Sequence, residues 1–345
     1  MNHGTEDKRP RVVVLLCTYN GERFLEKQLE SIYRQTRPAD SVLIADDNSH
    51  DCTRDILRRF ISRHGLNHWE LTVNRTNQGW RRNFLGLMAR AEGDVIMFSD
   101  QDDVWLPDRV ERTLAVLNDR PGIHCLVCRW QTIDEEDRVL GRRGDSGTGC
   151  VTRQERYFAI NAGELQSGCL MAYRGTLNDL LRGPVLSWLA APGPVPAHDV
   201  AVSRYAFFLG GLYCIDESWH LHRFHQANAS VGFAAAVGEK GLWSLSGRQI
   251  FCKEVLRVLE SLAPVLTERG IDSAELARIQ AWNMSRLRFM SDGAPADWLR
   301  TLRLGGLQKR ALLQAAGDFC YRFHLEGLAG RMSRLVLHLW EKVCK

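Results

Sequence analysis

The chain has 345 residues and a formal net charge of +4, with 45% hydrophobic and 25% charged residues. This composition is ordinary for a soluble globular protein of one large or two average domains. Ten cysteines in a chain this long do not make a disulfide scaffold. The N-terminus lacks the apolar segment of a signal peptide, and no apolar stretch reaches the roughly 18 residues of a membrane span. We therefore expect a cytoplasmic protein.

The first part of the chain alternates between short apolar runs and segments with apolar residues at helical spacing. We predict strands at five apolar runs: 11–16, 41–45, 69–73, 95–98 and 124–129. We predict helices in the segments between them: 24–32, 56–60, 84–88 and 110–117. This alternation predicts an α/β fold with a mostly parallel sheet flanked by helices.

Polar clusters follow four of the predicted strands. They are Thr18 to Asn20, Asp46 with Asp47, Asn77, and Asp100 to Asp103. Because right-handed crossovers bring the C-terminal ends of parallel strands to one edge of the sheet, we expect these clusters to meet there. That edge is where open α/β sheets bind ligands.

The last of these clusters places Asp100, Asp102 and Asp103 within four residues. Carboxylates this close repel one another unless a positive charge lies between them, and a divalent cation that carries substrate phosphates supplies one. The alternative is a solvated acidic turn that caps the following helix, since Asp is common at helix N-termini. The sister clusters on the same edge favour the metal site.

The pattern is less regular after residue 132. We predict a loop or hairpin at 132–146, a strand at 166–172, a helix at 197–208 and a strand at 212–215. A segment rich in His and Arg follows at 219–228.

The last third of the chain reads as helices alone. Residues 232–345 hold 17 Lys and Arg against 11 Asp and Glu, so the basic excess of the chain lies here. Apolar stripes at 251–262 and 325–339 favour packing in a helical bundle. The alternative is peripheral contact with an anionic membrane surface through the basic C-terminal region.

The segment Val12-Val13-Val14-Leu15-Leu16-Cys17-Thr18-Tyr19-Asn20-Gly21 resembles the opening of family 2 glycosyltransferases. Further motifs of that family occur in the family's order: Gln35-Thr36, Asp46 to Thr53, Asn77-Gln78-Gly79 with Asn83, His198-Asp199, and Arg223 to Asn228. The stretch from Phe98 to Pro107 is similar to the form found in bacterial rhamnosyltransferase-like members. The resemblance covers about residues 11–232 and implies an inverting glycosyltransferase domain of GT-A fold there, with a helical region at 233–345 for acceptor or membrane-surface docking.

The resemblance implies a set of residues that bind the donor nucleotide. They are Thr18, Tyr19, Asn20, Glu22, Asp46, Asp47, Asn77, Asn83, Asp100 and Gln101. Within this set, Asp47 matches the residue that contacts the pyrimidine, and Asp100 matches the residue near the ribose.

The resemblance also implies the groups that act on the diphosphate and the acceptor. Asp102 matches the ligand of a Mg²⁺ or Mn²⁺ ion, with Asp100 and His225 as further candidate ligands. Arg223 and His225 match a patch near the diphosphate, and Asp199 matches the general base. Such an ion neutralises the charge that grows on the departing diphosphate, and a base on the opposite face of the sugar activates the acceptor hydroxyl.

The chain departs from the family pattern at three positions. His198 stands where the family usually has Glu, which leaves the base Asp199 in place but removes any role of that Glu. His222 and Phe224 replace a Tyr and a Gln that usually flank the arginine.

Several alternatives stay open. His220, His222 and His225 are candidate ligands of a catalytic zinc, because His220 and His222 share one face of a strand. A sugar-phosphate nucleotidyltransferase also places a metal at such a sheet edge, and a non-catalytic scaffold that binds nucleotide sugars is the non-enzyme alternative. Trp105 packs in the core or stacks on a sugar.

The expected partners follow from these assignments. We expect a nucleotide-sugar donor, either dTDP-rhamnose or a UDP-sugar, and a glycan or lipid-linked saccharide acceptor of a bacterial surface polysaccharide. We expect no nucleic acid partner. The expected location is the cytoplasm, with docking at the inner face of the membrane if the acceptor is lipid-linked.

Overall fold

The computed structural model describes residues 9–143, 147–155, 167–225, 245–305, 309–323 and 336. The chain divides into two compact units, which are described separately. The first comprises Met1–Glu155 and Gln166–Phe224, and the second comprises Arg156–Leu165 and His225–Lys345. The domain boundary predicted at Gly232 lies outside the described residues.

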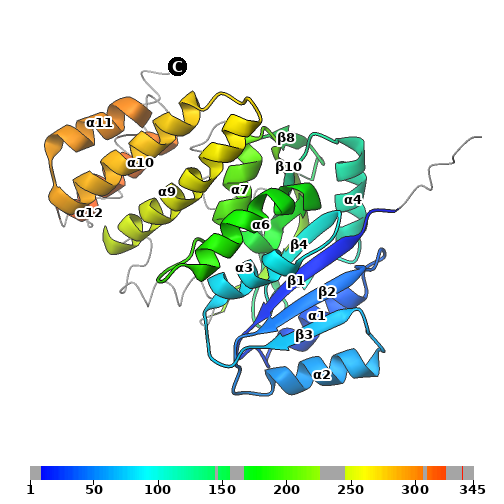
Figure 1. Cartoon of the computed structure of the whole chain (residues 1–345). Helices are drawn as coiled ribbons and strands as arrows, with labels where there is room; N and C mark the ends of the chain where they lie inside the picture. The colour runs from blue at the N-terminus through cyan, green and yellow to red at the C-terminus, as the bar shows by residue number, and fades with distance from the viewer. Residues whose placement is uncertain are drawn as a thin grey trace, which may run out of the picture. The chain divides into compact units, whose positions relative to one another are not determined.

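The first unit is built on one mixed sheet (Figure 1). The strands of this sheet follow the order β3-β2-β1-β4-β9-β6-β10-β5, with β7 beside β6 and β8 beside β10. Its strands are β1 (Val12–Thr18), β2 (Ser41–Asp46), β3 (Trp69–Val73), β4 (Val95–Ser99), β5 (Val104–Trp105), β6 (Cys125–Ile133), β7 (Val139–Arg143), β8 (Val151–Arg153), β9 (Met171–Arg174) and β10 (Leu212–Arg223). The four strands β3, β2, β1 and β4 are parallel. β9 runs antiparallel between β4 and β6, so the sheet is mixed at its centre.

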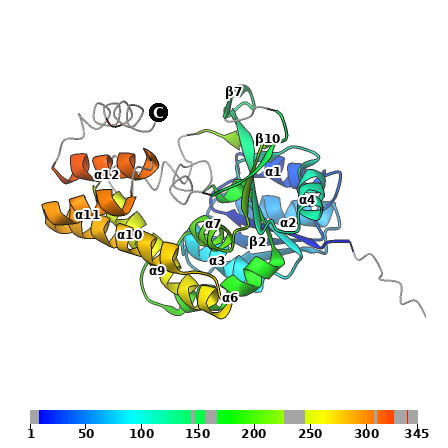
Figure 2. The ribbon, with the colours of Figure 1, turned by 90° about the horizontal axis from the view of Figure 1, so that it is seen from above.

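Helices cover both faces of this sheet. They are α1 (Leu25–Tyr33), α2 (Thr53–Arg63), α3 (Trp80–Arg90), α4 (Arg109–Asp119), α6 (Gly175–Ala190) and α7 (His198–Phe208). Seen from above, α3, α6 and α7 lie on one face, and α1, α2 and α4 lie on the other (Figure 2). The mixed sheet between two helical layers confirms the predicted α/β class.

The core of the first unit lies along the strands that the sequence predicts most clearly. Every residue of β1, β2 and β4 is buried, as their uninterrupted apolar runs require of strands with helices on both faces. Since these strands run in the same direction, they bring the polar residues at their C-terminal ends to one edge of the sheet.

The second unit contains four described helices: α9 (Leu245–Glu268), α10 (Ala274–Asp292), α11 (Pro295–Gly305) and α12 (Lys309–Arg322). Val255, Val258, Leu259 and Leu262 of the first predicted apolar stripe are buried, as bundle packing requires. A buried carboxylate, Asp318, accepts from Arg248 at 2.6 Å and from Arg286 at 2.6 Å. The second stripe, 325–339, lies outside the described residues apart from Val336. None of the described helices is long and apolar enough to cross a membrane.

Candidate active site

The acidic residues 100–103 form the loop between β4 and β5. β4 is buried and pairs with β1, which fixes the start of the loop. β5 has two residues, and it pairs with His220 and Leu221 of β10, which fixes the end. The loop therefore lies between the C-terminal end of β4 and the C-terminal end of β10, which supplies His222 and Arg223.

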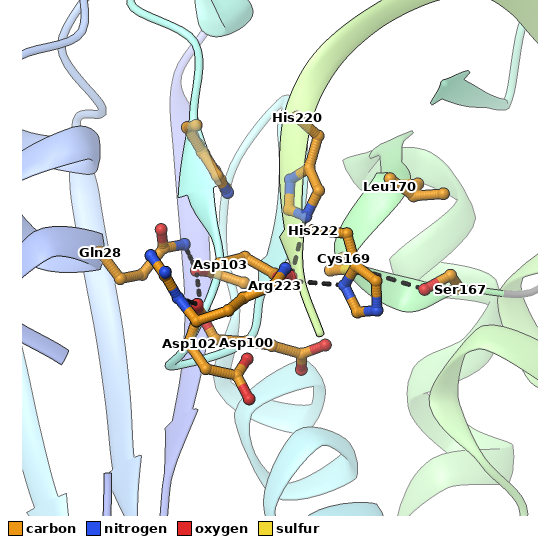
Figure 3. Close-up of polar contacts among 12 residues, drawn as sticks. Gln28, Asp100, Asp102, Asp103, Ser167, Cys169, Leu170, His220, His222 and Arg223 are labelled. Atoms are coloured by element: carbon orange, nitrogen blue, oxygen red, sulfur yellow. Dashed lines mark hydrogen bonds and ion pairs between the residues drawn. The ribbon is translucent and has the colours of Figure 1, made fainter. Parts of the chain in front are cut away.

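Asp103 is the buried anchor of this loop, and none of its surface is exposed (Figure 3). Its carboxylate accepts hydrogen bonds from His220 Nε2 at 2.8 Å, from His222 Nδ1 at 2.9 Å and from the backbone N–H of Arg223 at 2.9 Å. Burial alone would raise the pKa of Asp103, but the hydrogen bonds from both histidines and the charge of His222 hold it well below its usual value. Asp103 is therefore ionised and ties the loop to β10.

Arg109 decides how His220 is protonated. This arginine is the first residue of α4, is 1% exposed, stacks on the Trp105 ring at 4.1 Å, and donates to the Cys169 carbonyl at 2.6 Å. Its Nη1 lies 2.6 Å from His220 Nδ1. Because a guanidinium can only donate, Nδ1 must accept, and the ring proton must sit on Nε2, where Asp103 takes it. Burial lowers the pKa of His220 to about 4, so this histidine is neutral.

This tautomer argues against the zinc alternative. Potential ligand atoms of Asp103, Cys169, His220 and His222 lie within 4.8 Å of one another. However, His220 Nε2 carries a proton and its Nδ1 lone pair is taken by Arg109, so neither nitrogen is free to bind a metal. Burial also raises the pKa of the Cys169 thiol well above its usual value, which disfavours the thiolate that zinc requires. We conclude that this buried cluster is a hydrogen-bonded support.

Asp100 and Asp102 are the other two carboxylates of the loop. Burial and the charges of Asp103 and Asp102 raise the pKa of Asp100 to about 8, with Asp199 adding to the effect. Such crowding of carboxylates is relieved by a divalent cation, and oxygen ligands of this kind suit Mg²⁺ or Mn²⁺. The residues present thus fit the predicted ion, and Asp102 and Asp100 are the side chains that would hold it.

The ends of β1 and β2 are joined by buried polar contacts. Asp46 is fully buried, and its carboxylate accepts from the Thr18 hydroxyl at 2.9 Å, from the Ser49 hydroxyl at 2.5 Å and from the Ser49 backbone N–H at 3.0 Å. Both carboxylate oxygens of Asp46 thus accept hydrogen bonds from groups of the protein itself. Thr18 and Asp46, predicted to bind the donor, therefore shape this edge from beneath.

Asp47 holds the loop after β3 in a similar way. Its carboxylate accepts from Asn74 at 2.9 Å and from the backbone N–H groups of Gln78 and Gly79, each at 2.8 Å. Asn77 Oδ1 accepts from the Gly79 N–H at 3.1 Å, and the buried Asn83 accepts from Asn74 at 2.5 Å. The structure thus brings Asp47, Asn77 and Asn83 into one hydrogen-bonded group, as their shared sheet edge predicts.

Gln101 connects the acidic loop to the loop after β1. Its amide forms a pair of hydrogen bonds with the Tyr19 backbone, accepting from N–H at 2.8 Å and donating to the carbonyl at 3.0 Å. A Cβ atom on Gly21 would lie 2.2 Å from Gln101 Oε1, so this close approach needs glycine at position 21. Tyr19 keeps 43% of its surface exposed, which leaves its ring accessible to a ligand.

Asn20 and Glu22 tie the same loop to the start of α2. Asn20 has a φ of 46°, which asparagine tolerates better than most residues, and its side chain accepts from the His50 N–H at 2.9 Å. Glu22 accepts from the Cys52 N–H at 2.9 Å. These contacts hold the ends of β1 and β2 in one arrangement.

Arg223 is buried and holds two loops together. Its guanidinium donates to the Asp102 carbonyl at 2.8 Å and to the Asp134 carbonyl at 2.7 Å, pairs with Asp137 at 2.5 Å and covers the Phe24 ring at 4.6 Å. None of its surface is exposed. The diphosphate role predicted for Arg223 stays a prediction. His225 begins the second unit, so its predicted role also stays a prediction.

Asp199 lies in the first turn of α7 and is half-buried. Its charge contributes to the raised pKa of Asp100, so the structure brings the predicted base to the acidic loop. The preceding His198 packs against Phe84 at 4.0 Å and Phe98 at 4.4 Å, with Trp80 at 5.7 Å. The substitution of the family's Glu by His198 therefore creates an aromatic cluster behind the base.

Two features of the site were not predicted from the sequence. Arg109 is not among the predicted site residues and precedes the predicted helix at 110–117, and Asp103 is predicted only as an extension of the acidic group or a helix cap. The spacing of His220 and His222 on one strand face was the available signal, but their partner lies 117 and 119 residues away. Trp105 is 2% exposed, which supports core packing over stacking on a sugar.

Comparisons with known proteins agree with this geometry. The family model described as Glycosyl transferase family 2 matches residues 13–180. The chain is 36% identical over 260 residues to a protein named dTDP-rhamnosyl transferase RfbG from Shigella flexneri, which covers 72% of this chain and 84% of that protein. The chain belongs to glycosyl transferase family 2. It is therefore a glycosyltransferase, as its motifs predict.

Two further similarities extend over much of the chain of this family 2 glycosyltransferase. An uncharacterized glycosyltransferase from Nostoc sp. is 26% identical over 242 residues, or 69% of this chain and 72% of that one. The crystal structure of S. aureus TarS 1-349 in complex with UDP-GlcNAc superposes with a TM-score of 0.55 at 15% identity, and covers 96% of this chain and 90% of that one. At this identity the second similarity concerns the fold, and it confirms the GT-A architecture.

Proposed function

We propose that this glycosyltransferase moves a sugar, with inversion, from a pyrimidine nucleoside diphosphate to a hydroxyl of a glycan or lipid-linked saccharide in bacterial surface polysaccharide synthesis. The donor we favour is dTDP-rhamnose, because the relative that is 36% identical over 260 residues is named a dTDP-rhamnosyl transferase. A UDP-sugar is the second candidate, since the TarS neighbour of the same fold is described with UDP-GlcNAc.

One observation carries the proposed chemistry. At the acidic loop, burial and the charges of Asp103 and Asp102 raise the pKa of Asp100 to about 8, and the charge of Asp199 adds to the effect. Carboxylates gathered at this cost in repulsion are typical of a functional site.

The carboxylates divide the work. Asp199 accepts the proton of the acceptor hydroxyl, and the oxygen of that hydroxyl attacks the anomeric carbon from the face opposite the diphosphate. The bond between the anomeric carbon and the diphosphate oxygen breaks, and the nucleoside diphosphate leaves with the electron pair. Asp102, with Asp100, would hold a Mg²⁺ or Mn²⁺ ion that offsets the negative charge of the leaving diphosphate.

The nucleotide lies, in this proposal, over the group formed by Thr18, Asp47, Asn77, Asn83 and Gln101, with Tyr19 on its open side. Asp46, Asn20 and Glu22 hold the loops of that group. Arg223 supports the acidic loop from behind, and its contact with the diphosphate would require it to leave Asp134 and Asp137. The helical region at 233–345 is proposed to present the acceptor or to dock on a membrane surface.

The test begins with purified full-length protein and a panel of nucleotide sugars, with and without Mg²⁺ or Mn²⁺. A ligand that binds only the folded state raises the thermal midpoint, so dTDP-rhamnose or a UDP-sugar should do so. Turnover should release nucleoside diphosphate and leave the transferred sugar with the inverted anomeric configuration, which NMR of the product reports.

Matched variants separate the alternatives. Asp199→Asn should keep the donor-induced shift and lower turnover by at least about 100-fold, as loss of a general base does. Asp55→Asn changes an aspartate whose side chain is 74% exposed and serves as the control. Unchanged transfer by Asp199→Asn would refute the base. Release of pyrophosphate from a nucleoside triphosphate would instead indicate a nucleotidyltransferase, and donor binding without turnover a scaffold.

A further inference from the structure

His222 belongs to the buried support and also lies near Asp100 and Asp102 of the acidic loop. Its Nδ1 is bonded to Asp103 at 2.9 Å, while 32% of its side chain stays exposed. Asp100 and Asp102 are both close enough for their charges to act on the ring. Among the residues that the structure describes, no hydrogen bond to the other ring nitrogen, Nε2, is found. Figure 3 shows the ring beside Asp103, with the carboxylates of Asp100 and Asp102 nearby.

The contact at Nδ1 fixes the orientation of the ring. A carboxylate can only accept, so Nδ1 carries a proton that it donates to Asp103. Asp103 cannot turn away, because His220 and the Arg223 N–H hold both of its oxygens. The Nε2 atom is thus the free end of a rigid pair, which is the arrangement that metal-binding histidines take when a carboxylate orients them from behind.

Electrostatics favours a cation at this position. Asp103 holds Nδ1 of His222 at 2.9 Å, and the negative charges of Asp100 and Asp102 also act on the ring. These carboxylates favour a divalent ion at Nε2.

We infer that His222 is a ligand of the divalent ion, with Nε2 as the donor atom and Asp103 as the carboxylate that orients the ring. This inference rests on the proposed function and adds a nitrogen ligand to Asp102 and Asp100. The ligand set would then be mixed, with an imidazole that favours Mn²⁺ over Mg²⁺ or Ca²⁺. The resemblance to the family does not supply this residue, since the family usually has Tyr at position 222.

The experiment measures metal binding itself. Full-length protein with saturating dTDP is titrated with Mn²⁺, and the free ion is followed by electron paramagnetic resonance. His222→Asn keeps an amide N–H near the position of Nδ1, so it can still bond to Asp103, but it lacks Nε2. We expect Mn²⁺ to bind this variant at least tenfold more weakly and its preference over Mg²⁺ to shrink. His68→Asn, at an exposed histidine on another edge of the sheet, is the control and should bind as the wild type does.

The outcomes are distinct. Wild-type Mn²⁺ affinity in a folded His222→Asn variant overturns the inference and leaves the proposed function standing. Absence of Mn²⁺ binding by the wild type with dTDP refutes the metal part of the proposed function, and the inference with it. If His222→Asn does not fold, electron spin echo modulation of Mn²⁺ bound to His225→Asn decides: imidazole nitrogen coupling supports His222, and its absence overturns the inference.

Discussion

His198 gives the structure a pH-dependent stability that can be calculated and removed. Its ring is 4% exposed, and in the described residues neither ring nitrogen has a hydrogen-bond partner. Burial, assisted by the charge of Arg81, lowers the pKa of His198 to about 3. The imidazole is therefore neutral in the folded protein throughout the range in which an unfolded chain takes up a proton.

The sign follows from proton binding in the two states. Above about pH 6.5 the imidazole is neutral whether the chain is folded or not, so its contribution to stability is fully present. As the pH falls below this value the unfolded chain binds a proton that folded His198 refuses, and the free energy of unfolding falls. At pH 5 the loss is about 2 kcal/mol, since each pH unit contributes about 1.4 kcal/mol. The loss continues until the pH approaches about 3.

His198→Leu keeps an apolar side chain of similar size against Phe84 and Phe98 and removes the titration. The assay is urea unfolding at pH 7 and pH 5 for the wild type, for His198→Leu and for the exposed control His68→Leu. We expect the fall in free energy between these pH values to be smaller by about 2 kcal/mol in His198→Leu than in the wild type. Equal falls in the two proteins would refute the reasoning, and the control should match the wild type.

Three further substitutions test the contacts around the site. A Cβ atom on Gly168 would lie 2.1 Å from His198 Nε2, so Gly168→Ala should lower the free energy of unfolding by about 1–3 kcal/mol in chemical unfolding. In a His198→Ala protein the same substitution should cost less, and an equal cost in the wild type and in His198→Ala would contradict this contact. Gly21→Ala should push Gln101 away from Tyr19 and raise the KM for the donor while the thermal midpoint stays near the wild type, because only the end of a flexible side chain has to move; an unchanged KM would count against a donor role for that loop. Arg109→Met should lower the free energy of unfolding by about 3–5 kcal/mol, because it leaves His220 and the Cys169 carbonyl without their buried donor. The control is Arg112→Met on the same helix. If Arg109→Met lowers the free energy of unfolding less than this control does, the role of Arg109 is refuted.

Much of the fold could be predicted because the strands buried on both faces are continuous apolar runs. β1, β2 and β4 match the predicted ranges within two residues, and the polar clusters at their ends meet at one edge. β10 was predicted only to Ile215, but it continues to Arg223 with irregular pairing between Cys214 and His220. Its second half, Asp216 to His222, is mostly polar, and it is a strand because its neighbours β6 and β5 pair with it. Tertiary pairing of this kind overrides local pattern.

The division of labour within the acidic loop could not be predicted because it depends on register. Residues 100–103 look alike in the sequence, and their spacing along the chain does not show which of them turns inward. The pairing of Trp105 with His220 turns Asp103 toward both histidines and the Arg223 N–H. A shift of one residue would have turned the other face of β10 toward the loop.

The physical reason for this division is electrostatic. Three carboxylates within four residues cannot all remain ionised beside one another without positive partners. β10 supplies those partners for Asp103 through His220, His222 and the Arg223 N–H. Asp103 therefore stays ionised inside the fold without a bound ligand. Asp100 lies beside the charges of Asp103 and Asp102, and burial together with this repulsion raises the pKa of Asp100 to about 8. Because Asp103 anchors the loop, Asp100 and Asp102 are already ordered when a positively charged ligand binds at this edge. The loss of conformational entropy in the loop therefore occurs on folding and not on substrate binding.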